Sequence, residues 1–161
     1  MAIGQTSAMF FGDRITGLTN IGRALRPGGR LALLTWQPVA TNEWILDFST
    51  AMAAGRDLPP PPPDAPGPFT LAHPDVVRTA LDTAGFSDVE LQAQRAPMWF
   101  GHDADDAYQL VSGLLAWMLD GLDDTSRAGA LDALRNTIAA HETRDGVLYE
   151  SAAWIIAARR P

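Results

Sequence analysis

The sequence contains no cysteine and no lysine. Without cysteine, the chain can form no disulfide, no thiolate metal site and no cysteine-based nucleophilic site. The 12 basic residues are all arginine and are scattered, while 19 acidic residues bring the net charge to −7. Because phosphate binding needs clustered cations, this balance argues against a nucleic-acid partner. The absence of cysteine also fits a reducing compartment.

Long apolar runs and a basic leader segment are absent as well. No apolar stretch reaches the roughly 18 residues that a membrane span needs. With 47% hydrophobic and 19% charged residues, the composition is ordinary for a globular protein. We therefore expect a soluble, cytoplasmic protein with no membrane partner, folded as a single domain over residues 1–161.

The first long pattern is a helix, a glycine turn and a strand. Asp13 is a candidate N-cap, and the following apolar residues recur at helical spacing: Ile15, Leu18, Ile21 and Leu25. Pro27 cannot continue this helix, and Gly28-Gly29 are expected to close it with positive φ angles. The uninterrupted apolar run Leu31–Trp36 is typical of a strand that is covered on both faces.

The remainder alternates helices and strands. A helix is predicted over 42–54, with Trp44, Ile45, Phe48 and Met52 on its inner side, and another over 74–84, closed by Gly85. Two further helices are predicted, one from Asp103 or Asp105 to Met118 and one that begins after a cap at Asp124 or Thr125. Strands are predicted over 89–93 and, after the turn signal Asp145-Gly146, over 147–158.

A proline-rich loop over residues 57–69 interrupts this alternation, with five consecutive prolines at Pro59 to Pro63. Such a run favours the extended polyproline conformation and has no backbone amide hydrogens to donate. The loop is interpreted as a stiff spacer; the alternative is a ligand for a recognition domain with an aromatic groove.

Four short motifs together resemble a known family. They are Met9-Phe10-Phe11, the Leu-Arg-Pro-Gly-Gly-Arg-Leu run at 25–31, Trp36-Gln37-Pro38 with Asn42-Glu43-Trp44 just after, and Leu-x-x-Ala-Gly-Phe-x-x-Val at 81–89. In this order they are similar to the second half of an S-adenosylmethionine-dependent methyltransferase. The ubiquinone/menaquinone-type group of small-molecule methyltransferases is the most similar one.

The resemblance implies an α/β fold with a partial Rossmann-like sheet. The sheet would hold a remnant of the family's strand four, then strands five, seven and six, with a helical cap. The last strand would run antiparallel and insert between strands five and six. In this alignment only eight residues precede Met9, so the family's strands one to three would be missing and the chain would be a truncated methyltransferase.

The cofactor that the resemblance implies is S-adenosylmethionine, but its usual binding motif is absent. No Gly-x-Gly-x-x-Gly run occurs in the sequence. Where the family carries a Ser-Arg-Phe-Gly-like run, this chain has Gly4-Gln5-Thr6-Ser7. By resemblance, Gln5, Ser7 and Met9 would line a modified edge of the cofactor site. The alternative is that these residues form a frayed start of the chain with no role in cofactor binding.

Aromatic residues supply the remaining site candidates. By resemblance, Phe10, Trp36, Trp44 and Trp99 would line a pocket for a hydrophobic methyl acceptor; the alternative for each is core packing. His102, beside an aromatic cluster, is a candidate general base, whereas His73 and His141 are interpreted as helix-end residues. The histidines and carboxylates show no ligand spacing along the sequence, so no metal site is predicted.

Two functions remain open. The first is a truncated methyltransferase-like protein that takes a small-molecule ligand and is not competent alone. The second is a non-enzymatic, homodimeric binding or interaction module built from half of a methyltransferase fold. Half a doubly wound sheet leaves a strand edge with unpaired backbone groups, and a symmetric partner is the commonest cover for such an edge. A homodimer is therefore expected; the alternative is a separate polypeptide that supplies the glycine-rich half.

Overall fold

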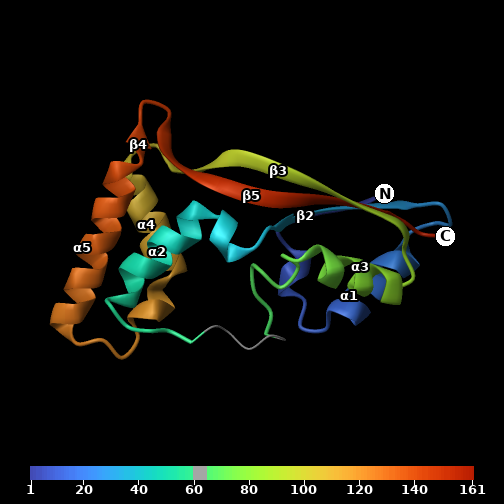
Figure 1. The fold of residues 1–161 in the computed structure, drawn as a ribbon, viewed down its shortest axis with the longest axis horizontal. Coiled ribbons are helices and arrows are strands. Elements are labelled where there is room, and N and C mark those ends of the chain that lie inside the picture. The colour runs from blue at the N-terminus through green and yellow to red at the C-terminus, as the bar shows by residue number, and fades with distance from the viewer. Residues whose placement is uncertain (60–64) are drawn as a thin grey trace. The chain divides into compact units, whose positions relative to one another are not determined.

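A computed structural model describes residues 1–59 and 65–161, which form two compact units (Figure 1). Unit 1 comprises Met1–Thr41, Pro61–Arg95 and Ala152–Pro161, and unit 2 comprises Asn42–Pro60 and Ala96–Ser151. Two long strands, β3 (Ser87–Gly101) and β5 (Gly146–Arg159), contribute residues to both units. The middle of the predicted proline-rich loop, residues 60–64, lies outside the described residues.

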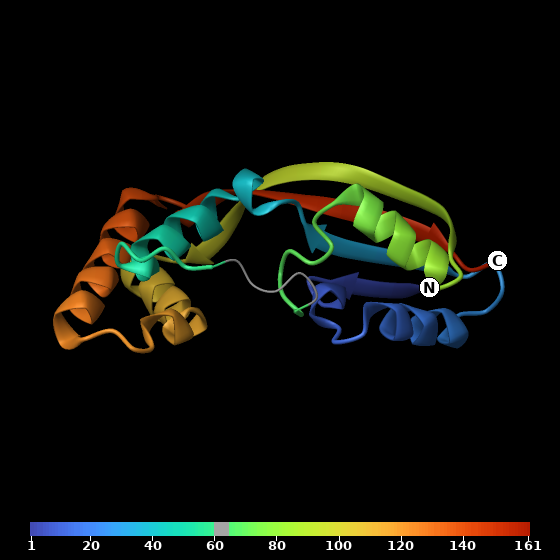
Figure 2. The same cartoon turned by 60° about the horizontal axis from the view of Figure 1, so that its bottom comes forward.

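The sheet confirms the strand order expected from the resemblance. Strand β1 (Ala2–Gln5) pairs in parallel with β2 (Arg30–Trp36), and β5 pairs antiparallel with β2. The order is β1-β2-β5-β3, so the last strand lies between the second and third ones (Figure 2). The two-residue β4 (Glu142–Thr143) pairs with the start of β5, across the predicted turn at Asp145-Gly146. The mixed α/β fold is therefore the predicted one.

Helix α1 (Arg14–Ala24) begins where the sequence indicates. The Asp13 carboxylate accepts a hydrogen bond of 2.9 Å from the Thr16 backbone N–H, which satisfies one of the unpaired amides of the first turn. The predicted closure by two glycines was wrong in detail. The helix ends at Leu25, whose backbone is extended, and only Gly28 has a positive φ, of 74°.

The core of unit 1 lies between one face of the sheet and two helices. Because paired residues point to the same face, the alternate residues of β2 and β5 enter this core together. Helices α1 and α3 (Pro74–Thr83) cover the same face with their apolar sides. The most deeply buried contributors are Leu18 of α1, Leu31 and Leu33 of β2, Val77 and Leu81 of α3, and Ile156 of β5.

The opposite face of this sheet is less covered. Ile3 of β1 is 72% exposed and Ile155 of β5 is 40% exposed, although both are large apolar residues. Leu34 pairs with Ile155 and points to the same face. Among the described strands, β1 has a single neighbour, β2, so its outer edge keeps unpaired backbone groups.

The partly buried indole of Trp154 connects the segment before α3 to β5. The Trp154 Nε1–H donates a 2.7 Å hydrogen bond to the Ala72 carbonyl, and Ala72 is 2% exposed.

We expect Trp154→Phe to lower the free energy of unfolding by about 1–3 kcal/mol, because the buried Ala72 carbonyl loses its hydrogen-bond donor. Urea denaturation followed by circular dichroism measures the loss. Trp117→Phe is the matched control: Trp117 is 65% exposed, and its replacement should change stability by less than about 0.5 kcal/mol. Equal effects of the two changes would contradict this assignment.

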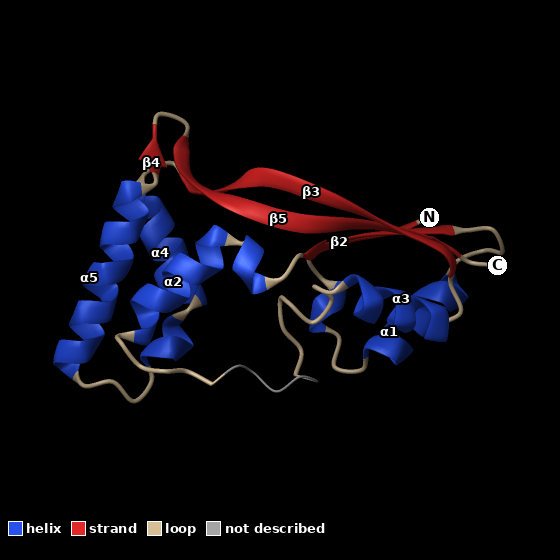
Figure 3. Ribbon diagram, viewed as in Figure 1, coloured by secondary structure: helices blue, strands red, loops and turns tan. Residues whose placement is uncertain are grey.

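Unit 2 contains most of the remaining helical residues (Figure 3). Its helices are α2 (Glu43–Ala53), α4 (Ala104–Leu114) and α5 (Asp124–Ala140). The helix predicted up to Met118 stops at Leu114 and continues after Leu115 as a short 3-10 segment, Ala116–Leu119. The cap predicted at Asp124 or Thr125 was also wrong: Asp123 caps α5 by accepting a 2.8 Å bond from the Ser126 N–H.

An aromatic cluster fills the centre of unit 2. Phe48 of α2 is 1% exposed, and its ring meets the rings of Phe100 and Tyr149 edge to face, at centroid distances of 5.0 and 4.7 Å. Trp44 adds a tilted contact with Phe100 at 6.0 Å. These rings interlock the inner side of α2 with the unit 2 ends of β3 and β5.

None of the helices in the described parts of the chain is both long and apolar enough to cross a bilayer.

Candidate functional site

The end of β1 holds two of the predicted cofactor residues. Gln5 is the last residue of β1 and pairs with Leu34 of β2, and both Gln5 and Ser7 are exposed. Between them, Thr6 has a positive φ of 46° and donates its N–H to the Leu34 carbonyl at 3.0 Å. Ligands of open α/β sheets bind outside the carboxyl ends of parallel strands, so Gln5 and Ser7 lie where the fold would place a ligand.

The third cofactor candidate, Met9, has its side chain in the core of unit 1 and is 0% exposed. Its carbonyl accepts hydrogen bonds from Thr70 Oγ1 at 2.7 Å and from the Gly67 N–H at 3.2 Å. The next residue, Phe10, is 52% exposed and can offer its ring to a ligand. Trp36 is partly buried at the end of β2, where it pairs with Ala153.

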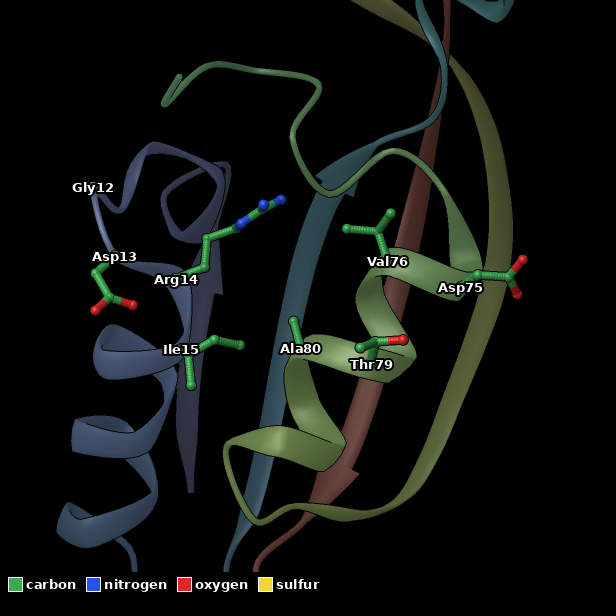
Figure 4. A pocket seen from close by; sticks show the side chains of 8 residues that line it. All are labelled: Gly12, Asp13, Arg14, Ile15, Asp75, Val76, Thr79 and Ala80. Atoms are coloured by element: carbon green, nitrogen blue, oxygen red, sulfur yellow. The ribbon is translucent and has the colours of Figure 1, made fainter. Parts of the chain in front are cut away.

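A groove of about 520 Å³ lies in unit 1 between the first turns of α1 and α3. Figure 4 shows Asp13, Arg14 and Ile15 on one side of it and Asp75, Val76 and Thr79 on the other. One wall is fixed, because Arg14 Nη1 donates a 2.7 Å bond to the Thr70 carbonyl. None of the predicted site residues lines this groove, and its walls are helices rather than strand ends.

Two predicted site residues of unit 2 are placed differently from each other. Trp44 is 6% exposed, and its indole N–H donates a 3.2 Å bond to Asn42 Oδ1, so it packs in the aromatic cluster. Trp99 is 48% exposed and meets the ring of His102 edge to face at 4.9 Å. The structure thus brings Trp99 and His102 together on the surface of unit 2. The backbone N–H of His102 donates to Asp106 Oδ2 at 3.3 Å.

Sequence reasoning missed a second group in unit 2, made of Glu43, Asp47 and His141. One side-chain ligand atom of each lies within 4.8 Å of those of the other two. Glu43 and Asp47 are one turn apart on α2, and His141 follows the last residue of α5. The i, i+4 spacing of the carboxylates was readable in the predicted helix over 42–54, but the approach of His141 to them was not.

The group sits in a network of hydrogen bonds. His141 Nδ1 lies 2.8 Å from the Thr137 carbonyl, and His141 Nε2 lies 3.3 Å from Glu43 Oε1. The Glu150 backbone N–H donates to Glu43 Oε2 at 2.8 Å, and this bond, with further help from His141, lowers the pKa of Glu43. Burial raises the pKa of Tyr149 to about 12, so its phenol stays protonated at neutral pH.

The residues at the end of β1 can be compared with what S-adenosylmethionine, the cofactor implied by the resemblance, would need. Exposed polar side chains at the end of β1 suit one edge of S-adenosylmethionine. A glycine-rich turn that lets the backbone approach the cofactor does not occur in the sequence. The residues at the end of β1 could therefore form one wall of a cofactor site, but the described residues alone do not fit the whole cofactor.

Comparison with solved structures gives the fold class. A protein of Bacillus halodurans, provisionally assigned as a methyltransferase, is 13% identical, with a TM-score of 0.51; the match covers 99% of this chain and 68% of that one. Phosphoethanolamine N-methyltransferase 2 of Haemonchus contortus, solved with phosphomonomethylethanolamine and S-adenosylhomocysteine, is 12% identical over 99% of this chain and 32% of its own, with a TM-score of 0.42. The same enzyme in complex with S-adenosyl-L-methionine is 12% identical over 99% of this chain and 32% of its own, with a TM-score of 0.40.

No family model matches the chain, and no curated protein matches it in sequence. The likeness to the Bacillus halodurans protein spans nearly all of this chain and agrees with the observed strand order. The chain thus has a methyltransferase-like α/β fold.

Proposed function

We propose that this chain provides the acceptor-side half of an S-adenosylmethionine-dependent methyltransferase, of the ubiquinone/menaquinone-type group. The observation that carries the proposal is the strand order β1-β2-β5-β3, with β5 antiparallel to β2. It is the order that the family resemblance implies, and the fold is similar to that of a structural neighbour whose match covers 99% of this chain. Methyl transfer needs mainly an aligned and desolvated approach, so the lack of a catalytic triad is compatible with it.

In this proposal Gln5 and Ser7 contact the cofactor, and exposed aromatic rings contact a hydrophobic acceptor. Phe10 of unit 1 is 52% exposed, which leaves ring surface for a ligand. Trp36 is partly buried at the carboxyl end of β2, the end at which such sheets bind ligands. Trp44 is 6% exposed and packs in the aromatic cluster of unit 2.

Cofactor binding would depend on a partner at the outer edge of β1. That edge has no neighbour among the described strands, and the adjoining sheet face exposes Ile3 and Ile155. An exposed apolar patch commonly marks an interaction site, so an apolar sheet face of this kind favours a partner. We propose a second copy of this chain as that partner, which makes a homodimer the working unit.

Calorimetric titration of the purified chain with S-adenosylhomocysteine, the product form of the cofactor, tests the proposal. We expect binding with a dissociation constant in the micromolar range and a dimer by light scattering. Ile3→Lys should weaken both, because it places a charge on the apolar sheet face. Val76→Lys is the matched control: Val76 is 38% exposed on α3, away from this face, and should change neither.

The alternative is a non-enzymatic homodimeric module with the same fold. A folded, dimeric chain that releases no heat with S-adenosylhomocysteine would favour this alternative and remove the cofactor role of Gln5 and Ser7. A folded monomer that binds the compound would retain the methyltransferase assignment and overturn the dimer.

A further inference from the structure

We infer that Glu43, Asp47 and His141 form a binding site for a divalent transition-metal ion of the Zn²⁺ or Mn²⁺ class. The site lies wholly within unit 2 and does not rest on the proposed methyltransferase function. Its donor set is one imidazole nitrogen and two carboxylate oxygens. Imidazole is a good ligand for Zn²⁺ and related ions, and carboxylates serve both Zn²⁺ and Mn²⁺.

The histidine is oriented as a metal ligand usually is. Its Nδ1 faces a backbone carbonyl, that of Thr137, so this nitrogen carries the proton and donates. A metal-binding histidine typically donates its other ring N–H to a carbonyl or carboxylate in this way, which fixes the tautomer. The remaining nitrogen, Nε2, points at Glu43 Oε1, and in the singly protonated ring both of these atoms are acceptors. A cation between them satisfies both.

The spacing suits a small ion. Two donor atoms that each lie about 2.0–2.1 Å from a tetrahedral centre are about 3.3–3.4 Å apart. His141 Nε2 and Glu43 Oε1 are 3.3 Å apart. The whole set lies within 4.8 Å, so a small rotation of the Asp47 carboxylate completes the contraction around an ion.

Each proposed metal ligand is oriented by a hydrogen bond or a ring contact with a neighbouring residue. The Glu150 backbone N–H donates to the second oxygen of Glu43 at 2.8 Å, and Thr137 Oγ1 donates to Asp47 Oδ2 at 3.2 Å. Because the Thr137 hydroxyl hydrogen is used on Asp47, the Tyr149 hydroxyl donates to Thr137 Oγ1, also at 3.2 Å. The Tyr149 ring stacks on the His141 ring at 3.8 Å and 15°, which sets the plane of the imidazole.

Charge and access favour an incoming cation. Among the ion pairs in the described parts of the chain, none joins an arginine to Glu43 or Asp47, so no arginine of these ion pairs competes with an incoming cation. The side chains of His141 and Glu43 are 23% and 41% exposed, which opens one side of the site to solvent. An ion held by three protein ligands would keep a position for water there.

The test starts from chelator-treated, dialysed full chain. We expect Zn²⁺ to bind with one-to-one stoichiometry and a micromolar or tighter dissociation constant by calorimetry, and Mn²⁺ to lose its free-ion electron paramagnetic resonance signal. In the proton NMR spectrum, Zn²⁺ should shift the ring signals of His141 and leave those of His73 and His102 unchanged. Mg²⁺ and Ca²⁺ should bind far more weakly, because neither favours a nitrogen ligand.

Single substitutions locate the ion. Glu43→Gln, Asp47→Asn and His141→Gln should each abolish measurable binding, and Thr137→Val should weaken it by about 10-fold, since it releases Asp47. Glu142→Gln and Asp145→Asn remove exposed carboxylates near His141 that lie outside the group, and should leave affinity unchanged. Glu43→Gln keeps an oxygen acceptor for the Glu150 N–H, so the fold is expected to survive, as checked by circular dichroism.

The inference is overturned by a folded parent chain that binds neither Zn²⁺ nor Mn²⁺ at millimolar concentration; the 3.3 Å contact is then only a histidine–carboxylate ion pair. It is equally overturned if binding persists in Glu43→Gln and Asp47→Asn but is lost in His102→Gln. Since S-adenosylhomocysteine is absent from these titrations, failure here is distinguishable from failure of the proposed function.

Discussion

Replacing Phe48 by alanine is expected to lower the free energy of unfolding by about 3–5 kcal/mol. Phe48 is 1% exposed at the centre of the unit 2 aromatic cluster. Its ring contacts Phe100 and Tyr149 edge to face at 5.0 and 4.7 Å, so truncation removes the shared partner of both rings and leaves a cavity. Guanidinium denaturation measured by tryptophan fluorescence and by far-ultraviolet circular dichroism gives the loss.

Phe10→Ala is the matched control for this change. It makes the same truncation at a residue that is 52% exposed, so it should cost about 1 kcal/mol or less. Because residues 1–161 are predicted to form a single domain, we expect one transition that both probes report together. Equal losses from Phe48→Ala and Phe10→Ala would contradict the placement of Phe48 at the centre of the unit 2 core.

Much of the fold could be predicted because local patterns and the resemblance agreed. Asp13 before apolar residues at helical spacing located the start of α1, and the apolar run after the Arg-Pro-Gly-Gly turn located β2. The position of β5 between β2 and β3 came from the resemblance alone. An alternating pattern predicts a strand but not its neighbours, since pairing depends on contacts between distant parts of the chain.

Strand β3 is longer than the alternating apolar pattern in the sequence predicts. Its predicted part stops at residue 93, yet the strand runs to Gly101. Residues 92–97 are all exposed, so no apolar alternation marks them, and Pro97 argues against a strand. Contacts with β5 support this stretch instead, among them the 2.8 Å bond from Ser151 Oγ to the Ala96 carbonyl. Tertiary pairing therefore overrides the local signal here.

The candidate sites divide in the same way. Gln5 and Ser7 could be placed near a strand end because the resemblance makes the first residues a remnant of the family's strand four, and β1 does end at Gln5. Glu43 and His141 could not be joined, because they are 98 residues apart and meet only when α2 packs beside the end of α5. Amino-acid composition cannot predict a contact between residues so far apart in the sequence. The spacing rules for metal ligands apply only to ligands within one segment.

The second large effect is expected at Gly146, the first residue of β5. It has a φ of 106°, which side chains with a Cβ rarely adopt, and a Cβ placed there would lie 2.5 Å from the Gly101 carbonyl oxygen and against the Trp99 indole. A backbone carbonyl cannot rotate away as a side chain can. We expect Gly146→Ala to lower the free energy of unfolding by about 2–5 kcal/mol, from backbone strain and overpacking together.

Gly129→Ala is the control for Gly146→Ala, because it adds the same methyl group in the interior of α5. A Cβ at Gly129 meets nothing within 4 Å, and alanine favours the helix, so this variant should gain about 0.5–1 kcal/mol. The two glycine changes thus predict opposite signs, measured by urea denaturation under identical conditions. If Gly146→Ala were as stable as the parent chain, the close approach of the β5 start to Gly101 would be refuted. The Trp99 ring would then also lose its assigned position beside this turn, and with it the contact to His102.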